Sequence, residues 1–490
     1  MDERRRVSTA RLASFAAARG EGGECEDNAI MALAAGRSEA EVSASYGIPA
    51  ARLRGLVTFY EHLGVKAEVF ACSGTSCRFP NGRGDGRAAR AEGAHAVCLG
   101  RCYAPPATSR SAAPIPYRTL DTAPMVLAPI MEGTGAAALY ALPQDAEAIL
   151  APLEASGLRG RGGAGFPTAR KWRTAAAARE AAGDAWVVAN GDEGDPGAYI
   201  DRLLLEEAPH AVLAGLVACA RAIGASRAIL YIRGEYPEAR ARVQAAIGEA
   251  AAEGWTGELK IRVVVGAGSF VCGEETALLR SIEGLRGEPW VKPPFPAVEG
   301  LDRLPTVVQN IETLALAGHL VRTGGQATSK AFCVAGAVAS PGVVEAPWGT
   351  PLRRLLDEGA GGARAGQTWK MALVGGPMGR VVPASEFDVP LSMEGLPGLG
   401  HGGIVVLDES VSVRALAEHL FEFAAGESCG NCTPCRVGTR QLAGIEDAAS
   451  MERLLRTMEL GSLCGFGKTV PTPVRDLIRH YGQEVFHVDH

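Results

Sequence analysis

The stretch from Ser156 to Trp172 reads Ser-Gly-Leu-Arg-Gly-Arg-Gly-Gly-Ala-Gly-Phe-Pro-Thr-Ala-Arg-Lys-Trp and contains five glycines. Glycines permit positive φ angles and let a backbone lie against a ligand, so we expect this stretch to bind a nucleotide or a flavin. The residues before it, Asp145 to Ala155, have a helical pattern, whereas the G-x-G-x-x-G dinucleotide fingerprint requires a preceding strand. We therefore expect a helix, a glycine loop, and a second helix starting near Pro167 whose N-terminus attracts an anion. Arg161 and Lys171 add positive charge there.

Composition narrows the class of protein. The chain has 490 residues, 47% apolar residues and a formal net charge of −6, which predicts several folded domains and argues against nucleic acid as a partner. The apolar run from Leu12 to Ala18 is short, which favours an amphipathic helix over a signal peptide. Ala211 to Ala220 is soon followed by arginines, so a membrane span is not expected. Twelve cysteines without a secretion signal suit metal or cluster ligation in a reducing cytoplasm.

The pattern changes several times along the chain. Residues 1 to 64 look helical, with a break near Gly47, and a strand-like run covers Ala67 to Ala71. Ala107 to Ala138 is rich in Ser, Pro, Ala and Gly and indicates a linker. Residues 330 to 407 suggest a small α+β module. Between 140 and 320, strands alternate with helices, which predicts a mainly parallel α/β sheet. The expected strands are Trp186 to Ala189, Ala228 to Ile232 and Ile261 to Val265, and the expected helices are Ala208 to Ile223, Pro237 to Ala252 and, further on, Val411 to Ala425.

Eight of the cysteines fall into two groups of four. Cys429, Cys432 and Cys435 follow C-x2-C-x2-C spacing, and Cys464 comes after 28 further residues, which matches [4Fe–4S] ligation. Zinc is the competing interpretation, although zinc sites usually pair two C-x2-C units. The earlier group has C-x4-C and C-x3-C pairs and suits a [2Fe–2S] centre, with structural zinc as the alternative. This earlier group consists of Cys72, Cys77, Cys98 and Cys102, and the isolated Cys25, Cys219, Cys272 and Cys333 are expected to be buried apolar thiols.

Two acidic glycine loops follow predicted strands. Asn190 to Gly197 comes after one strand and Gly266 to Thr276 after another, so both lie at the carboxyl edge of the sheet, where α/β proteins bind ligands. Lys292 and Phe295 then offer a cation and an aromatic ring in a rigid turn. Each feature alone is also compatible with a solvated turn or a surface loop. Together with the glycine loop they favour a flavin pocket.

These stretches resemble a known family. Arg159 to Trp172, Asn190 to Asp201, Gly266 to Thr276 and Lys292 to Ala297, together with the cysteine triplet in Glu427 to Arg436, are similar to the flavoprotein subunit of respiratory complex I. They also resemble its soluble relatives, the diaphorase subunits of NAD-reducing hydrogenases and NAD-dependent formate dehydrogenases. The N-terminal quartet, together with Val57-Thr-Phe-Tyr60, resembles the thioredoxin-like [2Fe–2S] subunit, here fused to the flavoprotein.

The resemblance implies a multidomain α/β fold. Its expected parts are N-terminal helices (1–64), an abbreviated thioredoxin-like [2Fe–2S] domain (65–125), a Rossmann-like FMN and NAD domain (140–322), a ubiquitin-like β-grasp module (328–400) and a helical [4Fe–4S] domain (408–490). It also implies that Glu193, Asp195 and Glu275 are catalytic. The implied cofactor contacts are Gly160, Arg161, Gly162, Gly163, Gly165, Phe166, Lys171, Asn190, Asp192, Glu193, Gly273, Glu274, Glu275, Lys292, Phe295, Asn310 and Thr313. Of these, Phe166, Asp195, Glu275, Lys292 and Phe295 are the expected NAD(H) contacts.

The sequence departs from the family pattern in places. Twenty residues separate Cys77 from Cys98, fewer than usual, which shortens the thioredoxin-like region. Gln309, Phe270 and Thr174 stand where the family usually has other residues, so the affinity for NAD is expected to differ from that of the family.

The flavin implied by the resemblance suits the predicted clusters. FMN accepts a hydride as two electrons and can release them one at a time, as iron–sulfur clusters require.

The implied activity is that of a cytoplasmic NAD(H) diaphorase subunit. A formate dehydrogenase is the first choice of complex, a NAD-reducing hydrogenase the second and complex I the third, while a zinc-binding structural module is the alternative from another class. The preference for formate rests on Asp195 and on the fusion, both of which the hydrogenase class shares. The molybdenum, tungsten or nickel–iron site must lie on a partner chain, with further iron–sulfur subunits possible, because no residue here is recognisable as a ligand for it.

Overall fold

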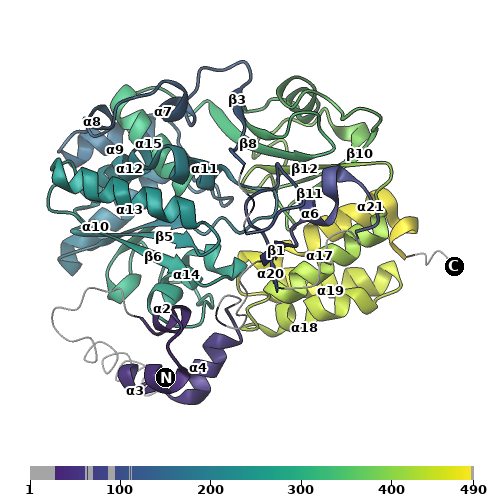
Figure 1. Ribbon diagram of the computed structural model, residues 1–490, viewed down its shortest axis with the longest axis horizontal. Helices are drawn as coiled ribbons and strands as arrows, with labels where there is room; N and C mark the ends of the chain where they lie inside the picture. The colour runs from purple at the N-terminus through teal and green to yellow at the C-terminus, as the bar shows by residue number, and fades with distance from the viewer. Residues whose placement is uncertain are drawn as a thin grey trace.

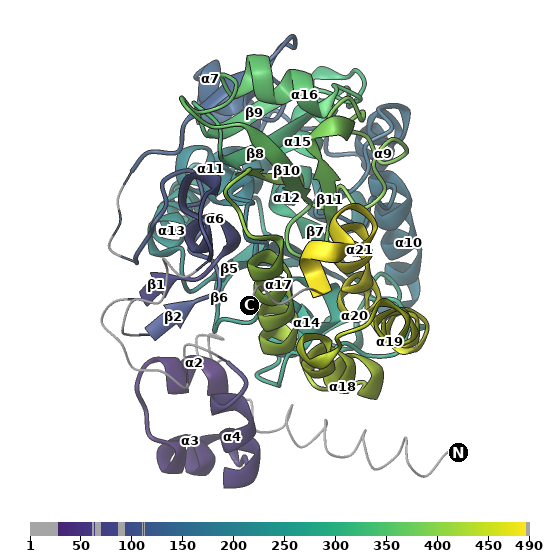
Figure 2. The same ribbon diagram turned by 90° about the vertical axis from the view of Figure 1, so that its right-hand side faces the viewer.

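The computed structural model describes residues 28–60, 63, 70–86, 94–109, 111 and 113–486. The described residues form a parallel four-stranded sheet with its helices, a mixed six-stranded sheet, a parallel two-stranded ladder, and helical regions near both ends of the chain. Figures 1 and 2 show α2 to α4 at the end of the molecule away from the six-stranded sheet, and the C-terminal helices beside that sheet. Cys25 and the predicted amphipathic helix at Leu12 to Ala18 lie outside the described residues.

The four-stranded sheet has the order β6-β5-β4-β7, and all of its pairs are parallel. Its strands are buried on both faces because alternate residues enter two different cores: Val187 packs in one and Val188 in the other. The predicted parallel α/β architecture is therefore confirmed. The strands are β4 (Trp186–Gly191), β5 (Arg227–Arg233), β6 (Lys260–Gly266) and β7 (Thr306–Asn310).

Helices cover both faces of this sheet. One face packs against the larger helices, and the other packs against α14 and the N-terminal helices through residues such as Leu53 and Leu278. The helices are α9 (Ala146–Ala155), α10 (Thr168–Ala182), α11 (Ile200–Glu207), α12 (Pro209–Ile223), α13 (Pro237–Ala252), α14 (Glu275–Ile282) and α15 (Ile311–Thr323). Among the described residues no single helix is long and apolar enough to span a membrane, and only the bent pair α11 and α12 meets the length and composition criteria jointly.

The six-stranded sheet has the order β11-β10-β12-β8-β9-β3. Most of it comes from the region predicted to be a small α+β module, but its edge strand β3 (Tyr117–Thr119) comes from the predicted linker and runs parallel to β9. Val343 donates its backbone N–H to the Pro116 carbonyl at 2.8 Å, so this part of the linker completes the sheet edge. The other strands are β8 (Ser329–Gly336), β9 (Gly342–Pro347), β10 (Trp369–Val374), β11 (Arg380–Pro383) and β12 (Gly403–Asp408).

Three short helices and a small ladder make up the described N-terminal region. The helices are α2 (Ala29–Ala34), α3 (Glu39–Tyr46) and α4 (Ala50–Val57), and Gly47 ends α3 in a left-handed conformation at the predicted break. Strands β1 (Phe70–Cys72) and β2 (Ala94–Ala96) pair in parallel, with α6 (Thr75–Arg78) after β1. The abbreviated thioredoxin-like domain stays a prediction.

The C-terminal region is helical, as expected. Its helices pack on the outer face of the six-stranded sheet through Leu416, Leu455 and Leu477, which share one core with Leu373 and Val405 of that sheet. The helices are α17 (Val413–Glu427), α18 (Thr433–Gln441), α19 (Ala448–Gly461), α20 (Gly465–Thr469) and α21 (Pro471–Phe486).

Candidate functional site

The glycine loop connects α9 to α10, as the sequence predicts. Its ends are held together by Gly160, whose N–H donates to the Phe166 carbonyl at 2.9 Å, and by the Arg159 guanidinium, which donates to the Gly165 carbonyl at 2.6 Å. No side chain caps the first turn of α10, which follows Pro167. The Thr168 N–H donates to the Leu158 carbonyl at 2.9 Å, so the N–H groups that remain for an anion are those of Ala169 and Arg170.

The glycine loop lies against the end of β7. The Arg161 N–H donates to the Thr313 hydroxyl at 2.9 Å, and Asn310 caps α15 by accepting the Thr313 N–H at 3.0 Å. A Cβ added to Gly162 would lie 3.2 Å from the Asn310 Cβ, so glycine is what permits this approach. The structure therefore brings together four predicted contacts from two segments about 150 positions apart in the chain.

The two acidic loops meet at the carboxyl edge of the parallel sheet. Asn190, at the end of β4, donates its side-chain N–H to the Gly273 carbonyl at 2.9 Å and accepts the Asp192 N–H at 3.1 Å. A Cβ on Gly273 would lie 3.3 Å from the Asp192 carbonyl oxygen. The loops thus form one continuous wall, in the position that the strand order predicts.

A network of alternating charges joins the second acidic loop to α10, the helix that follows the glycine loop. The Lys171 ammonium lies 3.4 Å from the Glu275 carboxylate, and the Lys292 ammonium lies 2.8 Å from Glu274 and 2.9 Å from Glu275. Burial raises the pKa of Glu275, but the two lysines outweigh burial and hold this pKa below its usual value. Beside the network, the rings of Phe166 and Phe295 are 43% and 54% exposed. Exposed rings beside paired charges can stack on a planar base.

Two predicted cofactor contacts lie against residues of the six-stranded module. The Arg161 guanidinium is buried over the Trp348 ring, with 4.7 Å from its carbon to the ring centroid, and its Nε and Nη1 have no hydrogen-bond partner among the described residues. Asp195 is partly buried and lies against Gly376 of the six-stranded module. The contact is close, since a Cβ added to Gly376 would lie 2.9 Å from the Asp195 Oδ1. Burial raises the pKa of Asp195 to about 6.

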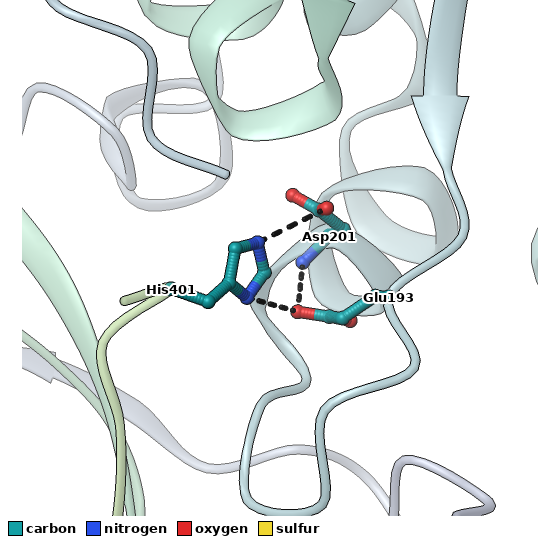
Figure 3. A group of neighbouring side chains, drawn as sticks. All are labelled: Glu193, Asp201 and His401. Atoms are coloured by element: carbon teal, nitrogen blue, oxygen red, sulfur yellow. Dashed lines mark hydrogen bonds and ion pairs between the residues drawn. The ribbon is translucent and has the colours of Figure 1, made fainter. Parts of the chain in front are cut away.

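Sequence reasoning missed one residue of this region. His401 precedes β12 in a run of glycines and places its ring between Glu193 and Asp201 (Figure 3). A buried histidine that faces two carboxylates is not visible in sequence, because the three residues come from separate elements. The one indication in the sequence was that a histidine lies among glycines, in Gly400 to Gly403.

The C-terminal cysteines lie near enough to one another that Cys464 and Cys432, after burial, raise the pKa of Cys429. Cys432 precedes α18 and Cys464 precedes α20, so both helix N-termini point at the sulfurs. The Leu463 N–H donates to the Cys432 sulfur at 3.5 Å, and Cys435 lies 3.3 Å from the Ser428 hydroxyl. Burial raises the pKa of Cys429 to about 11 and that of Cys435 to about 12, so ionisation of these two thiols calls for a nearby cation, which the iron of a cluster would supply.

The N-terminal cysteines lie under the first acidic loop, and all four are buried. The sulfurs of Cys98 and Cys102 are 3.7 Å apart, and Gly197 in the acidic loop donates its N–H to Cys102 at 3.2 Å. Contact with Cys98 and then burial raise the pKa of the Cys102 thiol well above its usual value. Of the isolated cysteines, Cys219, Cys272 and Cys333 are buried, as predicted.

The residues present fit the cofactors that the resemblance implies. Glycines leave room beside Asn310 and Asp192, an unpartnered guanidinium and an uncapped helix N-terminus suit a phosphate, and thiol sets suit iron. Gln309 is buried and accepts the Trp172 indole N–H at 3.3 Å, so it supports the glycine-loop helix.

Comparison with known proteins gives the family. Residues 153–318 match the Nuo51 FMN-binding domain, residues 331–382 the SLBB domain, and residues 415–487 the iron–sulfur binding region of the F component of NADH-ubiquinone oxidoreductase. The chain is 40% identical to NADP-reducing hydrogenase subunit HndC of Solidesulfovibrio fructosivorans, over 68% of this chain and 74% of that one. It is 38% identical to the F 2 component of the NADH-quinone oxidoreductase of Rhizobium meliloti, over 70% and 89%.

A solved structure matches nearly the whole chain. It is a chain in the crystal structure of an NAD+-reducing [NiFe]-hydrogenase in the air-oxidized state, with a TM-score of 0.82, 32% identity, and coverage of 93% of this chain and 92% of that one. This chain therefore belongs to the family of NADH-binding FMN and [4Fe–4S] flavoprotein subunits, the oxidoreductase components of complex I and of NAD-reducing hydrogenases.

Proposed function

We propose that this chain is the diaphorase subunit of a soluble, cytoplasmic dehydrogenase complex, and that it exchanges electrons between NAD(H) and two iron–sulfur clusters through FMN. One observation carries the proposal: the candidate flavin pocket touches both cysteine sites. Gly197 of the first acidic loop donates to Cys102, and Phe270 of the second packs on Phe466, with 5.6 Å between ring centroids, beside Cys464. FMN, when bound, supplies two-electron chemistry toward nicotinamide and one-electron chemistry toward clusters.

The proposed roles follow the geometry of the pocket. The glycine loop and the N-terminus of α10 would hold the FMN phosphate, and the wall of the two acidic loops would orient the flavin ring. The NAD(H) contacts would be Lys292, Glu275 and Asp195, with Phe166 and Phe295 as stacking rings. The FMN contacts would be Gly160, Arg161, Gly162, Gly163, Gly165, Lys171, Asn190, Asp192, Glu193, Gly273, Glu274, Asn310 and Thr313.

We propose a [2Fe–2S] cluster at the N-terminal cysteines and a [4Fe–4S] cluster at the C-terminal ones. A single zinc, at about 2.3 Å from each thiolate, would bring every pair of sulfurs to about 3.8 Å. Among the described residues, no three cysteine sulfurs all lie within 4.8 Å of one another. The close pair at 3.7 Å, Cys98 and Cys102, suits two ligands of one iron. These distances favour clusters over the zinc alternative.

The proposed function requires a catalytic partner subunit, for which there are two candidate classes. Our first expectation is a formate-oxidising subunit with molybdenum or tungsten, based on Asp195 and the fused N-terminal region. The second is a nickel–iron hydrogenase subunit, which is supported by the likeness over 93% of this chain to a chain of an NAD+-reducing [NiFe]-hydrogenase structure. Purification of the native complex with metal analysis decides: molybdenum or tungsten indicates the first and nickel the second. Recovery of this chain without such a subunit would refute both.

A further inference from the structure

Arg233 lies between the first acidic loop and the N-terminal cysteines. It is the last residue of β5, and its side chain is buried. Its Nη1 donates to the Glu193 carbonyl at 2.5 Å, and its Nη2 donates to the Cys98 carbonyl at 2.9 Å. One guanidinium therefore bonds the backbone of a proposed flavin contact and the backbone of a proposed cluster ligand. The fixed, planar donors of arginine suit such a bridge, because they hold two acceptors in a set arrangement.

The loop from Cys98 to Cys102 fits closely on the residues around this guanidinium. Gly100, in the middle of the loop, has a φ of 60°, and a Cβ there would lie 2.4 Å from the Tyr236 hydroxyl. The Arg233 guanidinium carbon lies 5.3 Å from the centroid of the Tyr236 ring. Arg202 donates to the Gly100 carbonyl at 3.0 Å. The flavin domain thus holds the cysteine loop at several points, beside the Arg233 guanidinium.

The positive charge of Arg233 does not depend on its surroundings, because a guanidinium stays protonated in proteins. Its counter-charge is Glu235, whose side chain is buried and lies 2.5 Å from Nη2. Of this ion pair, the guanidinium is the member that bonds the cysteine loop. The positive end of a buried pair therefore faces the N-terminal cluster site, where little water screens its charge.

We propose that Arg233 is a positioning residue of the N-terminal cluster site, which holds the cysteine loop against the first acidic loop and favours the reduced form of the cluster. The inference rests on the proposed function, because it requires the [2Fe–2S] cluster and the FMN proposed above. One electron passed from reduced FMN adds one negative charge to the cluster site, and no bond forms or breaks. A nearby fixed cation stabilises the added charge and so raises the reduction potential.

The test is a redox titration of the full chain, loaded with FMN and clusters and followed by EPR. The signal of the N-terminal site is the one that Cys102→Ser removes. Arg233→Gln should lower the equilibrium constant for reduction of this site roughly tenfold, as expected for the loss of a hydrogen bond from a charged group. That factor corresponds to about 59 mV for a one-electron couple. Arg233→Lys keeps the charge and should have a smaller effect.

Glu235→Gln should change the same potential in the opposite direction. It removes the counter-charge and leaves the guanidinium in place, so reduction of the N-terminal site should become more favourable. Arg380→Gln is the matched control, because Arg380 is also paired with a buried carboxylate, Asp476, at 2.6 Å, but lies on β11. This variant should leave the potential of the N-terminal site unchanged.

Equal N-terminal potentials in Arg233→Gln and wild type, at full cluster content, would overturn the inference and leave the diaphorase function intact. Wild-type protein without a [2Fe–2S] signal would overturn both the inference and the proposed cluster. If Arg233→Gln does not fold or does not hold the cluster, Glu235→Gln decides, because an unchanged or lower potential in that variant contradicts the proposal. A shift in Arg380→Gln as large as that in Arg233→Gln would also contradict it.

Discussion

The two cysteine sites contain four thiols each but are built into the molecule in different ways. The four ligands of the C-terminal site come from one helical region, where successive helices begin at Cys432 and Cys464, and both of these cysteines are partly exposed. Cys429 also packs against Val271 and Ala277 of the flavin domain. The N-terminal site is buried completely, and its loops are held by the flavin domain: Gly197 donates to Cys102 and Arg233 donates to the Cys98 carbonyl at 2.9 Å.

The ligands of the C-terminal site lie within one segment of the chain, whereas the N-terminal site also depends on a hydrogen bond from a distant segment. The Gly197 to Cys102 contact joins residues 95 positions apart, so the N-terminal site depends on the acidic loop and the loop depends on it. The hydrogen bonds to the C-terminal sulfurs come from Ser428 and Leu463 of the same region, so that site should tolerate the loss of a flavin-loop hydrogen bond better than the N-terminal site.

The substitution Cys464→Ser should have the largest effect and tests the C-terminal site by itself. Loss of one thiolate leaves an iron without a ligand, so one cubane EPR signal should disappear completely. FMN should stay reducible by NADH, because, among the described residues, the sulfurs of this site accept hydrogen bonds from Ser428 and Leu463 of the same region and not from the flavin loops. An intact cubane signal in this variant would show that Cys464 is not the fourth ligand.

Cys102→Ser should remove the other cluster signal and also disturb the flavin. The Gly197 N–H loses its sulfur acceptor, and a lost hydrogen bond of about 0.5 to 1.5 kcal/mol corresponds to a roughly two- to tenfold weaker FMN affinity. EPR and FMN titration measure the two effects. If FMN binds this variant and Cys464→Ser equally well, the contrast between the two sites is wrong.

Asp195→Asn probes the same acidic loop without touching a cysteine. A carboxylate there can accept hydrogen bonds from NADH, and losing them costs about 1 to 3 kcal/mol, or roughly five- to more than a hundredfold in KM. FMN content should stay nearly unchanged, and Asp195→Ala should have the larger effect. Steady-state kinetics with NADH and NADPH measure this. An unchanged KM at full flavin loading would remove Asp195 from the site.

The last expected effect is a pH dependence of the wild-type KM for NADH, which requires no substitution. Because burial raises the pKa of Asp195 to about 6, the side chain becomes neutral and loses acceptor strength below that pH. KM should thus rise by up to about tenfold per pH unit below 6 and stay level above it. The acidic limb should be absent in Asp195→Asn, and its persistence there would assign it to another group.

The sequence predicted what depends on local patterns. Strand β4 was visible as a buried apolar run, α10 began where Pro167 indicated, and the cysteine spacings grouped the eight thiols. The parallel sheet followed from the alternation of strands and helices. These features are determined by neighbours in the chain.

The remaining features needed long-range contacts. Nothing in the composition of the predicted linker indicated that β3 would pair with β9, because that pairing completes the edge of a distant sheet. His401 was missed for the same reason, since its two carboxylates lie on another module. The packing of the Arg161 guanidinium on Trp348 was also not predictable, because the two residues are far apart in the chain; its contact with the cofactor stays a prediction.

The central claim is that NAD(H), flavin and clusters meet on this one chain. The most direct test is to incubate the isolated protein, loaded with FMN and iron–sulfur clusters, with NADH and ferricyanide. The account predicts NADH-dependent ferricyanide reduction, with no oxidation of formate or hydrogen by this chain alone. Bound FMN without NADH-dependent reduction of any acceptor would contradict it.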